Sequence, residues 1–207
     1  MKNAISGCAL ILLLLSAGCI RSHVPIQYYL LNADPTPAGP IAEAALISPD
    51  TVIGIGPVHI PEYLNRPQIV VGVSGNRYRL DEDHRWAERL DENIERTLIE
   101  SLYAQLGEVQ IVRHPWAARR KIKYRTRIEI LELYPDAQGQ SRMSAQWTIG
   151  NRDQTFESER FECAIETSAG DFDAFAAAQS ACLGRMSVDI AQTLVRLIRT
   201  SGTPDRR

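Results

Sequence analysis

The chain has 207 residues and a nearly balanced charge, with 23 Lys and Arg against 25 Asp and Glu. This length is enough for one domain with a substantial core. The net charge of −2 is mildly acidic and gives no reason to expect a nucleic-acid partner.

The first 18 residues have the form of a bacterial export signal. Lys2 supplies an early positive charge, and an almost wholly apolar run from Ala4 to Leu15 follows it. A membrane-spanning helix needs about 20 apolar residues, and Arg21 ends the apolar stretch before that length is reached. Residues 1–18 are therefore interpreted as a signal peptide and not as a membrane anchor.

The signal ends in small residues followed by a cysteine, in the order Leu15-Ser16-Ala17-Gly18-Cys19. This ending resembles the bacterial lipobox, although the leucine is displaced by one position. The resemblance implies cleavage before Cys19 and acylation of its thiol, and two or more acyl chains hold a protein stably at a membrane. The alternative is an ordinary secretory signal with a chance cysteine at its border.

Residues 19–25 are predicted to form a lipidated tether. From Ile20 to Pro25 the chain can extend at most about 20 Å, so the folded domain should lie close to the bilayer. In diderm bacteria, an aspartate after the acylated cysteine is the usual signal for retention at the inner membrane, and this chain has Ile20 there. By analogy with that sorting rule, we expect the periplasmic face of the outer membrane.

Residues 26–200 are predicted to form a single α/β domain. Its first half should contain a strand, an irregular loop, a strand apolar on both faces, a proline-bracketed loop and a hairpin, at residues 26–31, 35–49, 51–60, 61–67 and 68–80. The Gly54-Ile55-Gly56 segment is followed by Pro57 and lacks the third glycine of a dinucleotide fingerprint. It is interpreted as a strand that uses small residues for close packing.

The second half should contain a helix, a short strand, a three-stranded meander and a final helix, at residues 83–106, 109–112, 121–166 and from 171 onward, before a polar tail at 201–207. Asp83 is placed to cap the first helix, in which Trp86 and Leu90 begin an apolar stripe at a spacing of four. The segment 121–134 alternates apolar and basic residues. Its basic face is interpreted either as a contact for lipid headgroups or as protection of the sheet against aggregation.

The residues that could carry chemistry form no catalytic or metal site. The histidines are scattered without metal-ligand spacing, at His23, His59, His84 and His114. Cys163 and Cys182 are expected to face the core from a strand and from the final helix. In the oxidising periplasm they could form a disulfide that closes about 20 residues and contributes about 3 kcal/mol, or they could pack as two buried thiols. No cofactor is predicted apart from the covalent lipid on Cys19.

Several segments match a known family of lipoproteins. They are the lipobox followed by Tyr28-Tyr29-Leu30, the run from Ile53 through the 61–67 loop to Val70, the Arg85–Leu90 helix start, the 143–149 strand around Trp147, and Ser187–Ala191. The most specific are the Ile53–Val70 run and Arg85-Trp86-Ala87-Glu88. With these segments, the chain resembles the PqiC-type auxiliary lipoproteins of ABC and MCE-domain transport systems over nearly all of residues 19–200.

This resemblance implies a fold and a role. The implied fold is a three-layer α/β domain with a mixed β-sheet flanked by helices, similar to the N-terminal domains of TolB-like proteins. The implied role is non-enzymatic: an outer-membrane-anchored auxiliary that docks onto a periplasm-spanning MCE protein, in a system that moves phospholipid and supports envelope integrity. The expected partners are the membrane, through the acyl chains, and the MCE protein; phospholipid and further copies of the chain are compatible additional partners.

The candidate partner interface comprises Tyr63, Leu64 and Arg66 on the 61–67 loop, together with Arg85 and Trp86. These residue types are common at binding hot spots, and the flanking prolines should stiffen the loop. The alternative is that Tyr63 and Trp86 complete the core. Two rival functions stay open: a structural or secretion-machine envelope lipoprotein, and a periplasmic lipoprotein enzyme, which would need a clustered pair of groups with shifted pKa values in a cleft.

Overall fold

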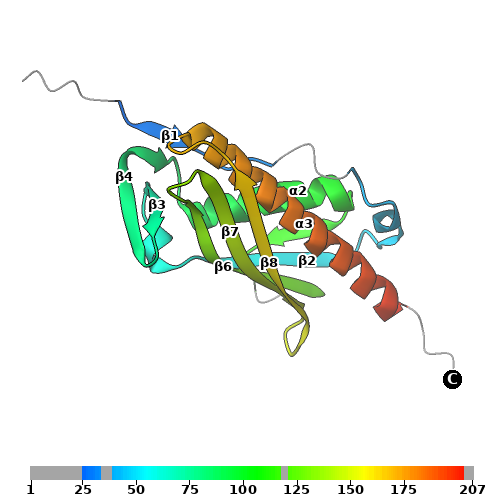
Figure 1. The fold of residues 1–207 in the computed structure, drawn as a ribbon. Helices are drawn as coiled ribbons and strands as arrows, with labels where there is room; N and C mark the ends of the chain where they lie inside the picture. Colours follow the sequence, from blue (N-terminus) through cyan, green and yellow to red (C-terminus); the bar gives the residue numbers. More distant parts are fainter. Residues whose placement is uncertain (1–24, 34–38, 118–120, 203–207) are drawn as a thin grey trace, which may run out of the picture.

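The structure is a computed structural model, and it describes residues 25–33, 39–117 and 121–202. The predicted signal peptide, Cys19, residues 20–24 of the tether and residues 203–207 of the tail lie outside the described residues. The described elements form two β-sheets and two long helices (Figure 1). In chain order they are β1 (Gln27–Tyr29), η1 (Ala42–Leu46), β2 (Val52–His59), η2 (Glu62–Leu64), β3 (Gln68–Ser74), β4 (Arg77–Trp86), α2 (Leu90–Leu106), β5 (Gln110–Arg113), β6 (Tyr124–Pro135), β7 (Gln140–Gly150), β8 (Thr155–Glu166) and α3 (Phe172–Gly202).

The larger sheet has five strands in the order β5-β2-β6-β7-β8. β2 runs parallel to β5 and β6, whereas β6, β7 and β8 form an antiparallel meander. The predicted meander is therefore confirmed. Successive side chains on a strand point to opposite faces, and on β6 this places Tyr124 and Ile128 in the core while Arg127 and Glu129 are exposed.

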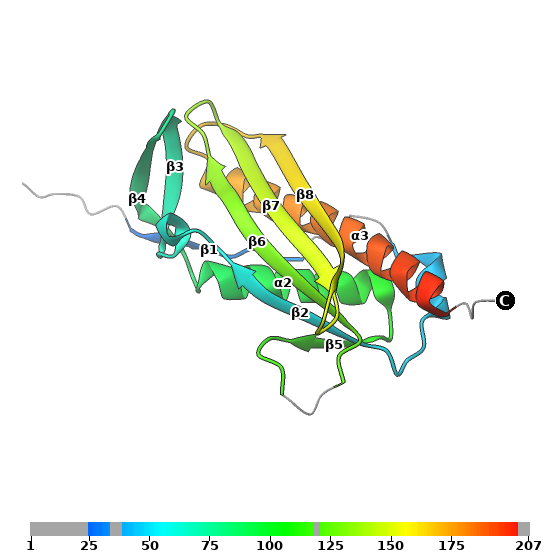
Figure 2. The ribbon, with the colours of Figure 1, turned by 90° about the horizontal axis from the view of Figure 1, so that it is seen from below.

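Both long helices lie on the apolar face of this sheet (Figure 2). The stripe predicted for this helix is confirmed from Leu90 onward, whereas its predicted first member, Trp86, lies in β4. The confirmed members are all buried: Leu90, Ile94, Leu98, Leu102 and Leu106. α3 buries Phe175, Cys182 and Met186 on its core-facing side. Between the helices, Gln105 Nε2 donates a hydrogen bond to Ser187 Oγ at 2.7 Å.

The predicted mixed α/β class is confirmed, and the arrangement of layers is simpler than the sequence suggests. The resemblance implies helices flanking the sheet; both long helices lie on one face of it, and the outer face of the meander carries exposed Arg127, Glu129, Gln146 and Arg160. Burying charged groups without partners is costly, so this face is left to solvent. One helical layer covers the large sheet, and the small sheet stands at one end of the molecule (Figures 1 and 2).

The small sheet has the strand order β1-β4-β3. β3 and β4 form the predicted hairpin, with Gly75 at φ +49 in the turn, a left-handed conformation that glycine adopts without steric cost. β1 is shorter than predicted and pairs in parallel with the end of β4. Just beyond β1, the N–H of Leu31 donates to the buried Asn93 Oδ1 at 2.7 Å, and Asn93 Nδ2 donates to the carbonyl oxygen of Leu31 at 2.8 Å.

The prediction of a helix over 83–106 is wrong for its first residues, because the helix begins only at Leu90. Asp83 and Trp86 belong to β4, and α2 begins at Leu90 without a side-chain cap. The backbone N–H of Trp86 donates to the Pro67 carbonyl at 2.7 Å, and β1 pairs along the same segment. Pairing with strands distant in the sequence therefore outweighs the local pattern. Trp86 matched the apolar spacing of the helix because its side chain, although it comes from a strand, is buried in the same core as that of Leu90.

The glycines of β2 are packing positions, as the sequence analysis proposed. A Cβ on Gly54 would lie 2.8 Å from the ring of Trp116, and a Cβ on Gly56 would collide with the carboxylate of Glu95. Gly56 also has φ +100, a conformation that other residues adopt only with strain. Close approach of neighbouring groups, and not phosphate binding, explains this pair.

At the carboxyl end, α3 continues through Gly202 and so enters the predicted polar tail. The predicted irregular loop over 35–49 contains the short helix η1 in its described part. Within the described residues, neither α2 nor α3 has a stretch that is apolar enough to cross a bilayer.

Candidate functional site

The predicted interface loop lies at the small-sheet end of the molecule. The bond from the Trp86 N–H to Pro67 brings the 61–67 loop beside the end of β4. A cavity of about 330 Å³ opens between them, with Arg66, Pro67 and Trp86 among its lining residues. The structure thus brings the two parts of the predicted interface together in one place.

Two of the predicted interface residues belong to the core. Leu64 is 2% exposed and Trp86 is 4% exposed. The Trp86 ring lies 6.0 Å from the ring of Phe175 on α3, measured between centroids. Neither side chain is available to a partner, which corrects the prediction for Leu64 and agrees with the alternative for Trp86. Arg66 is exposed, and Arg85 is partly exposed beside Glu82.

Tyr63 belongs to a cluster of tyrosines at the surface. Its ring stacks on that of Tyr78 at 5.2 Å, and Tyr78 meets Tyr134 edge-on at 5.3 Å. The Tyr63 hydroxyl donates to the carbonyl oxygen of Leu131 at 3.3 Å. Tyr78 is 41% exposed, and Leu80 beside it on β4 is 37% exposed. We call Tyr63, Tyr78 and Tyr134 the tyrosine surface.

Two phenols of the tyrosine surface, those of Tyr63 and Tyr134, have pKa values raised above the ordinary value. Burial raises the pKa of the Tyr63 phenol well above its ordinary value, and the neighbouring Tyr78 and Glu132 act in the same direction. Burial also raises the pKa of Tyr134, with Glu132 as the next cause. The rings therefore present an apolar body with a polar hydroxyl, a combination common at protein interfaces.

Sequence reasoning missed Tyr78 and Tyr134. They come from different sheets, and they meet because β3 crosses the end of β6, where Gly72 bridges to Asp136. A Cβ on Gly72 would lie 2.7 Å from the Tyr134 ring, so the glycine makes room for the ring. The available signal was a large aromatic residue in the otherwise polar start of β4, and only the contact between the sheets gives it meaning.

Three polar groups contact the carboxylate of Asp81, which lies on β4 of the small sheet. It accepts a bond from Arg79 Nη1 at 2.8 Å, lies 2.6 Å from His84 Nδ1 and accepts the N–H of Asp83 at 3.3 Å. Burial alone would raise the pKa of Asp81, but the bonds from His84 and Arg79 outweigh it, so the pKa is lowered. The His84 ring stacks on Phe172 at 4.0 Å, which ties the small sheet to the start of α3.

A second cavity, of about 510 Å³, lies at the carboxyl ends of β2 and β5 beside α2. Ligands of open α/β sheets commonly bind at such ends. Here Glu95 is 6% exposed, and its oxygens accept bonds from Arg113 Nε and from the backbone N–H of His114. Through these bonds the carboxylate joins α2 to β5 and to the residue that follows it.

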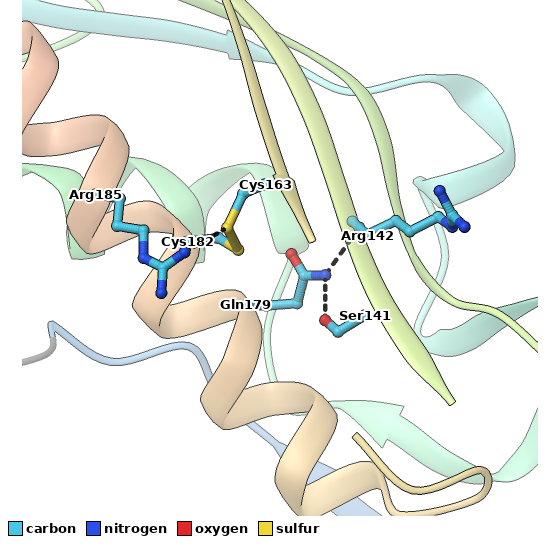
Figure 3. The surroundings of a disulfide bond; sticks show 6 residues. All are labelled: Ser141, Arg142, Cys163, Gln179, Cys182 and Arg185. Carbon is cyan, nitrogen blue, oxygen red and sulfur yellow. Dashed lines mark hydrogen bonds between the residues drawn. A yellow bond between two sulfur atoms is a disulfide. The ribbon is translucent and has the colours of Figure 1, made fainter. Parts of the chain in front are cut away.

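Cys163 of β8 and Cys182 of α3 are joined by a disulfide (Figure 3). Of the two alternatives left open by the sequence, the structure has the bridge. One turn earlier on α3, Gln179 Nε2 donates to Ser141 Oγ at 2.8 Å and to the carbonyl oxygen of Arg142 at 2.9 Å. A covalent link and an amide side chain therefore hold α3 on the meander.

Among the described side chains, no group of three or more His, Cys, Asp or Glu is placed to hold a metal ion. The proposed lipidation residue, Cys19, lies outside the described residues. The described part of the molecule thus offers surfaces for contact at the small-sheet end and a tightly packed body behind them.

Comparison with known proteins gives both a family and a fold. A family model described as "ABC-type transport auxiliary lipoprotein component" matches residues 29–191. Protein XCC0632 from Xanthomonas campestris superimposes with a TM-score of 0.67 at 18% identity, covering 86% of this chain and 99% of that one. The crystal structure of an uncharacterized protein gives a TM-score of 0.66 at 18% identity, with coverages of 82% and 99%. These structural matches concern the fold alone, and no curated protein matches the sequence.

Proposed function

The chain belongs to the family of ABC-type transport auxiliary lipoprotein components, and from this membership we propose that it is the outer-membrane-anchored auxiliary of an MCE/ABC-type intermembrane lipid transport system. In this role it turns over no substrate, docks onto the periplasm-spanning MCE protein and supports envelope integrity. The family match carries the proposal, because residues 29–191 include nearly all of the described domain.

Anchoring in this proposal depends on Cys19. The thiol receives a diacylglyceryl group, and the new amino terminus is acylated after cleavage. Several acyl chains hold a protein stably at a bilayer, whereas one chain binds only marginally. Ile20, which follows the cysteine, lacks the carboxylate of an inner-membrane retention signal. The protein accordingly resides on the periplasmic face of the outer membrane.

Docking in this proposal uses the tyrosine surface together with Arg66. Tyr78 and Arg66 are exposed, and both are of residue types that dominate binding energy at interfaces. The rings are already stacked on one another, so little rotamer freedom is lost when a partner covers them. Leu64 and Trp86 are buried in the core and take no part in this docking surface.

Metabolic labelling tests the anchor. We expect radiolabelled palmitate to enter the wild-type protein and the protein to sediment with outer-membrane fractions. Cys19→Ser should abolish the label and release the protein into the soluble periplasmic fraction. A Cys19→Ser protein that still sediments with the envelope would contradict the anchor.

Co-purification from detergent-solubilised membranes tests the docking. The MCE-domain protein of the same transport system should be retained by the wild type and lost with Tyr78→Ala combined with Arg66→Ala. Leu46→Ala is the matched control, because Leu46 is 73% exposed and lies on η1, away from the tyrosine surface. Circular dichroism establishes that each variant is folded. Equal retention by folded variants would refute the docking surface.

A further inference from the structure

The first described segment has an apolar face turned toward solvent. Tyr29 and Leu31 are 7% and 0% exposed and belong to the core. Between and before them, Tyr28 is 62% exposed, Leu30 is 40% exposed and Ile26 is partly exposed. Alternation along an extended chain places Ile26, Tyr28 and Leu30 on the opposite side from Tyr29 and Leu31. We call these three residues the amino-terminal ridge.

The ridge lies at the edge of the molecule. β1 is the outer strand of the small sheet and pairs with β4 alone. The first described residues lie at this edge (Figure 1). Exposed apolar side chains that cluster in this way mark a surface that another phase or molecule covers.

The chain outside the described structure identifies what covers the ridge. From Cys19 to Pro25 the backbone spans at most about 20 Å, and the ridge begins at the next residue. Acyl chains on Cys19 would therefore keep the ridge within a short distance of the bilayer. Tyrosine is also one of the residues enriched where proteins meet the headgroup layer, and Tyr28 is the most exposed of the three.

The charged side chains near the ridge do not favour a charged partner over a phospholipid surface. In the small sheet Tyr28 lies directly opposite Arg85, and Arg85 is paired with Glu82. Further along the same end, Arg89 pairs with Asp91 at 2.7 Å. Because these arginines are paired with carboxylates and Asp171 and Asp173 lie near Tyr29 of the same strand, contact with the surface would depend on apolar insertion more than on anionic lipid.

We propose that the amino-terminal ridge inserts into the phospholipid surface and fixes how the domain stands on the membrane. This inference rests on the proposed acylation of Cys19. The acyl chains set the distance, and the ridge sets the orientation. The β1 edge of the small sheet faces the bilayer, and η1 is held away from it.

Leu46 provides an internal control for this orientation. The Ala87 N–H bonds the Tyr29 carbonyl at the start of α2, and the Ile41 N–H bonds the Gln105 carbonyl at its end. A helix of 17 residues is about 25 Å long. The ridge and Leu46 therefore lie at opposite ends of α2, and both are exposed apolar positions.

The test uses the acylated full-length protein in vesicles of phosphatidylethanolamine and phosphatidylglycerol. With Cys19 acylated and Cys163 bridged to Cys182, a cysteine introduced at one position is the free thiol of the mature chain. Tyr28→Cys, Leu30→Cys and Leu46→Cys each receive an environment-sensitive fluorophore. We expect a blue shift and quenching by nitroxide-bearing phospholipid at positions 28 and 30, and an unshifted signal open to aqueous iodide at 46. Adding Tyr28→Asp to Leu30→Cys should return the label to water.

Each other outcome overturns the inference in a distinguishable way. If the acylated protein sediments with vesicles while the labels at 28 and 30 stay open to iodide, the anchor stands and the ridge contact is wrong. If the labels are shielded from iodide without quenching by nitroxide lipid, a protein surface such as a second copy covers the ridge instead. If the purified protein carries no acyl group and does not sediment, the proposed anchoring and the inference built on it both fail.

Discussion

The two ends of this molecule are built in different ways. Between the large sheet and its helices, side chains are completely buried, with Leu98, Ile128 and Cys182 at 0%, 1% and 0% exposure, and a disulfide crosses between the layers. The small sheet has three strands and leaves Tyr28 and Tyr78 exposed. Stability is therefore concentrated in one region and contact surface in the other. Binding elements are commonly drawn from the less stable parts of a fold.

Removing a side chain from the large core should have the largest effect on stability. Leu98→Ala leaves a cavity between α2 and the sheet and should lower the free energy of unfolding by about 2–5 kcal/mol. Urea denaturation measures the difference. Leu46→Ala removes the same side chain at an exposed site and should change it by less than about 0.5 kcal/mol. Similar losses in both variants would mean that the large half is not the stable one.

Opening the disulfide should have the next largest effect. A bridge closing about 20 residues contributes about 3 kcal/mol, mainly by restricting the unfolded chain. Cys163→Ala combined with Cys182→Ala should therefore lower the melting temperature, and reductant should affect the wild type alone. Intact mass after alkylation in denaturant checks the bridge directly: two alkyl groups should be added only after reduction. Their addition to unreduced protein would contradict the bridge.

Removing the charge of Asp81 should weaken the attachment of the small sheet. Asp81→Asn replaces a buried carboxylate that accepts several hydrogen bonds and should cost about 1–3 kcal/mol. Because the pKa of Asp81 is lowered by folding, the ionised form stabilises the native state. This stabilisation is complete above the ordinary carboxyl pKa and is lost as the pH falls through the lower folded value.

Denaturation at several pH values measures this effect. The stability gap between wild type and Asp81→Asn should be constant near neutral pH and should shrink in acid. Asp83→Asn, at an exposed neighbour on the same strand, should show no comparable gap. If the stability difference between wild type and Asp81→Asn instead grew as the pH fell, the ionised carboxylate of Asp81 would not be the stabilising form.

Truncating the tyrosine surface should have the smallest effect on stability. Tyr78→Ala removes two ring contacts that are each worth about 0.5–1.5 kcal/mol when well buried, and Tyr78 is partly exposed, so the loss should be at the low end. The same variant should reduce binding of the MCE protein, which Leu98→Ala at a mild temperature should not. A Tyr78→Ala variant as unstable as Leu98→Ala would place this ring in the core.

The large half could be predicted closely, because its patterns are local. Alternation along β6 and the spacing of Leu90, Ile94 and Leu98 depend on one face of one element being buried. The small-sheet end could not, because its structure depends on distant partners. The end of β4 is a strand because β1 pairs with His84, Arg85 and Trp86, and because the Trp86 N–H bonds the Pro67 carbonyl. Tyr78 and Tyr134 become one surface only when the two sheets meet.

The direct test of the account is the affinity between the purified protein and the periplasmic part of the MCE protein. We predict saturable binding by the wild type and by Leu46→Ala. Combining Tyr78→Ala with Arg66→Ala should weaken it at least about tenfold, which corresponds to about 1.4 kcal/mol. Absence of binding by the wild type, or equal affinity in the double variant, would contradict the division into a stable body and a contact end.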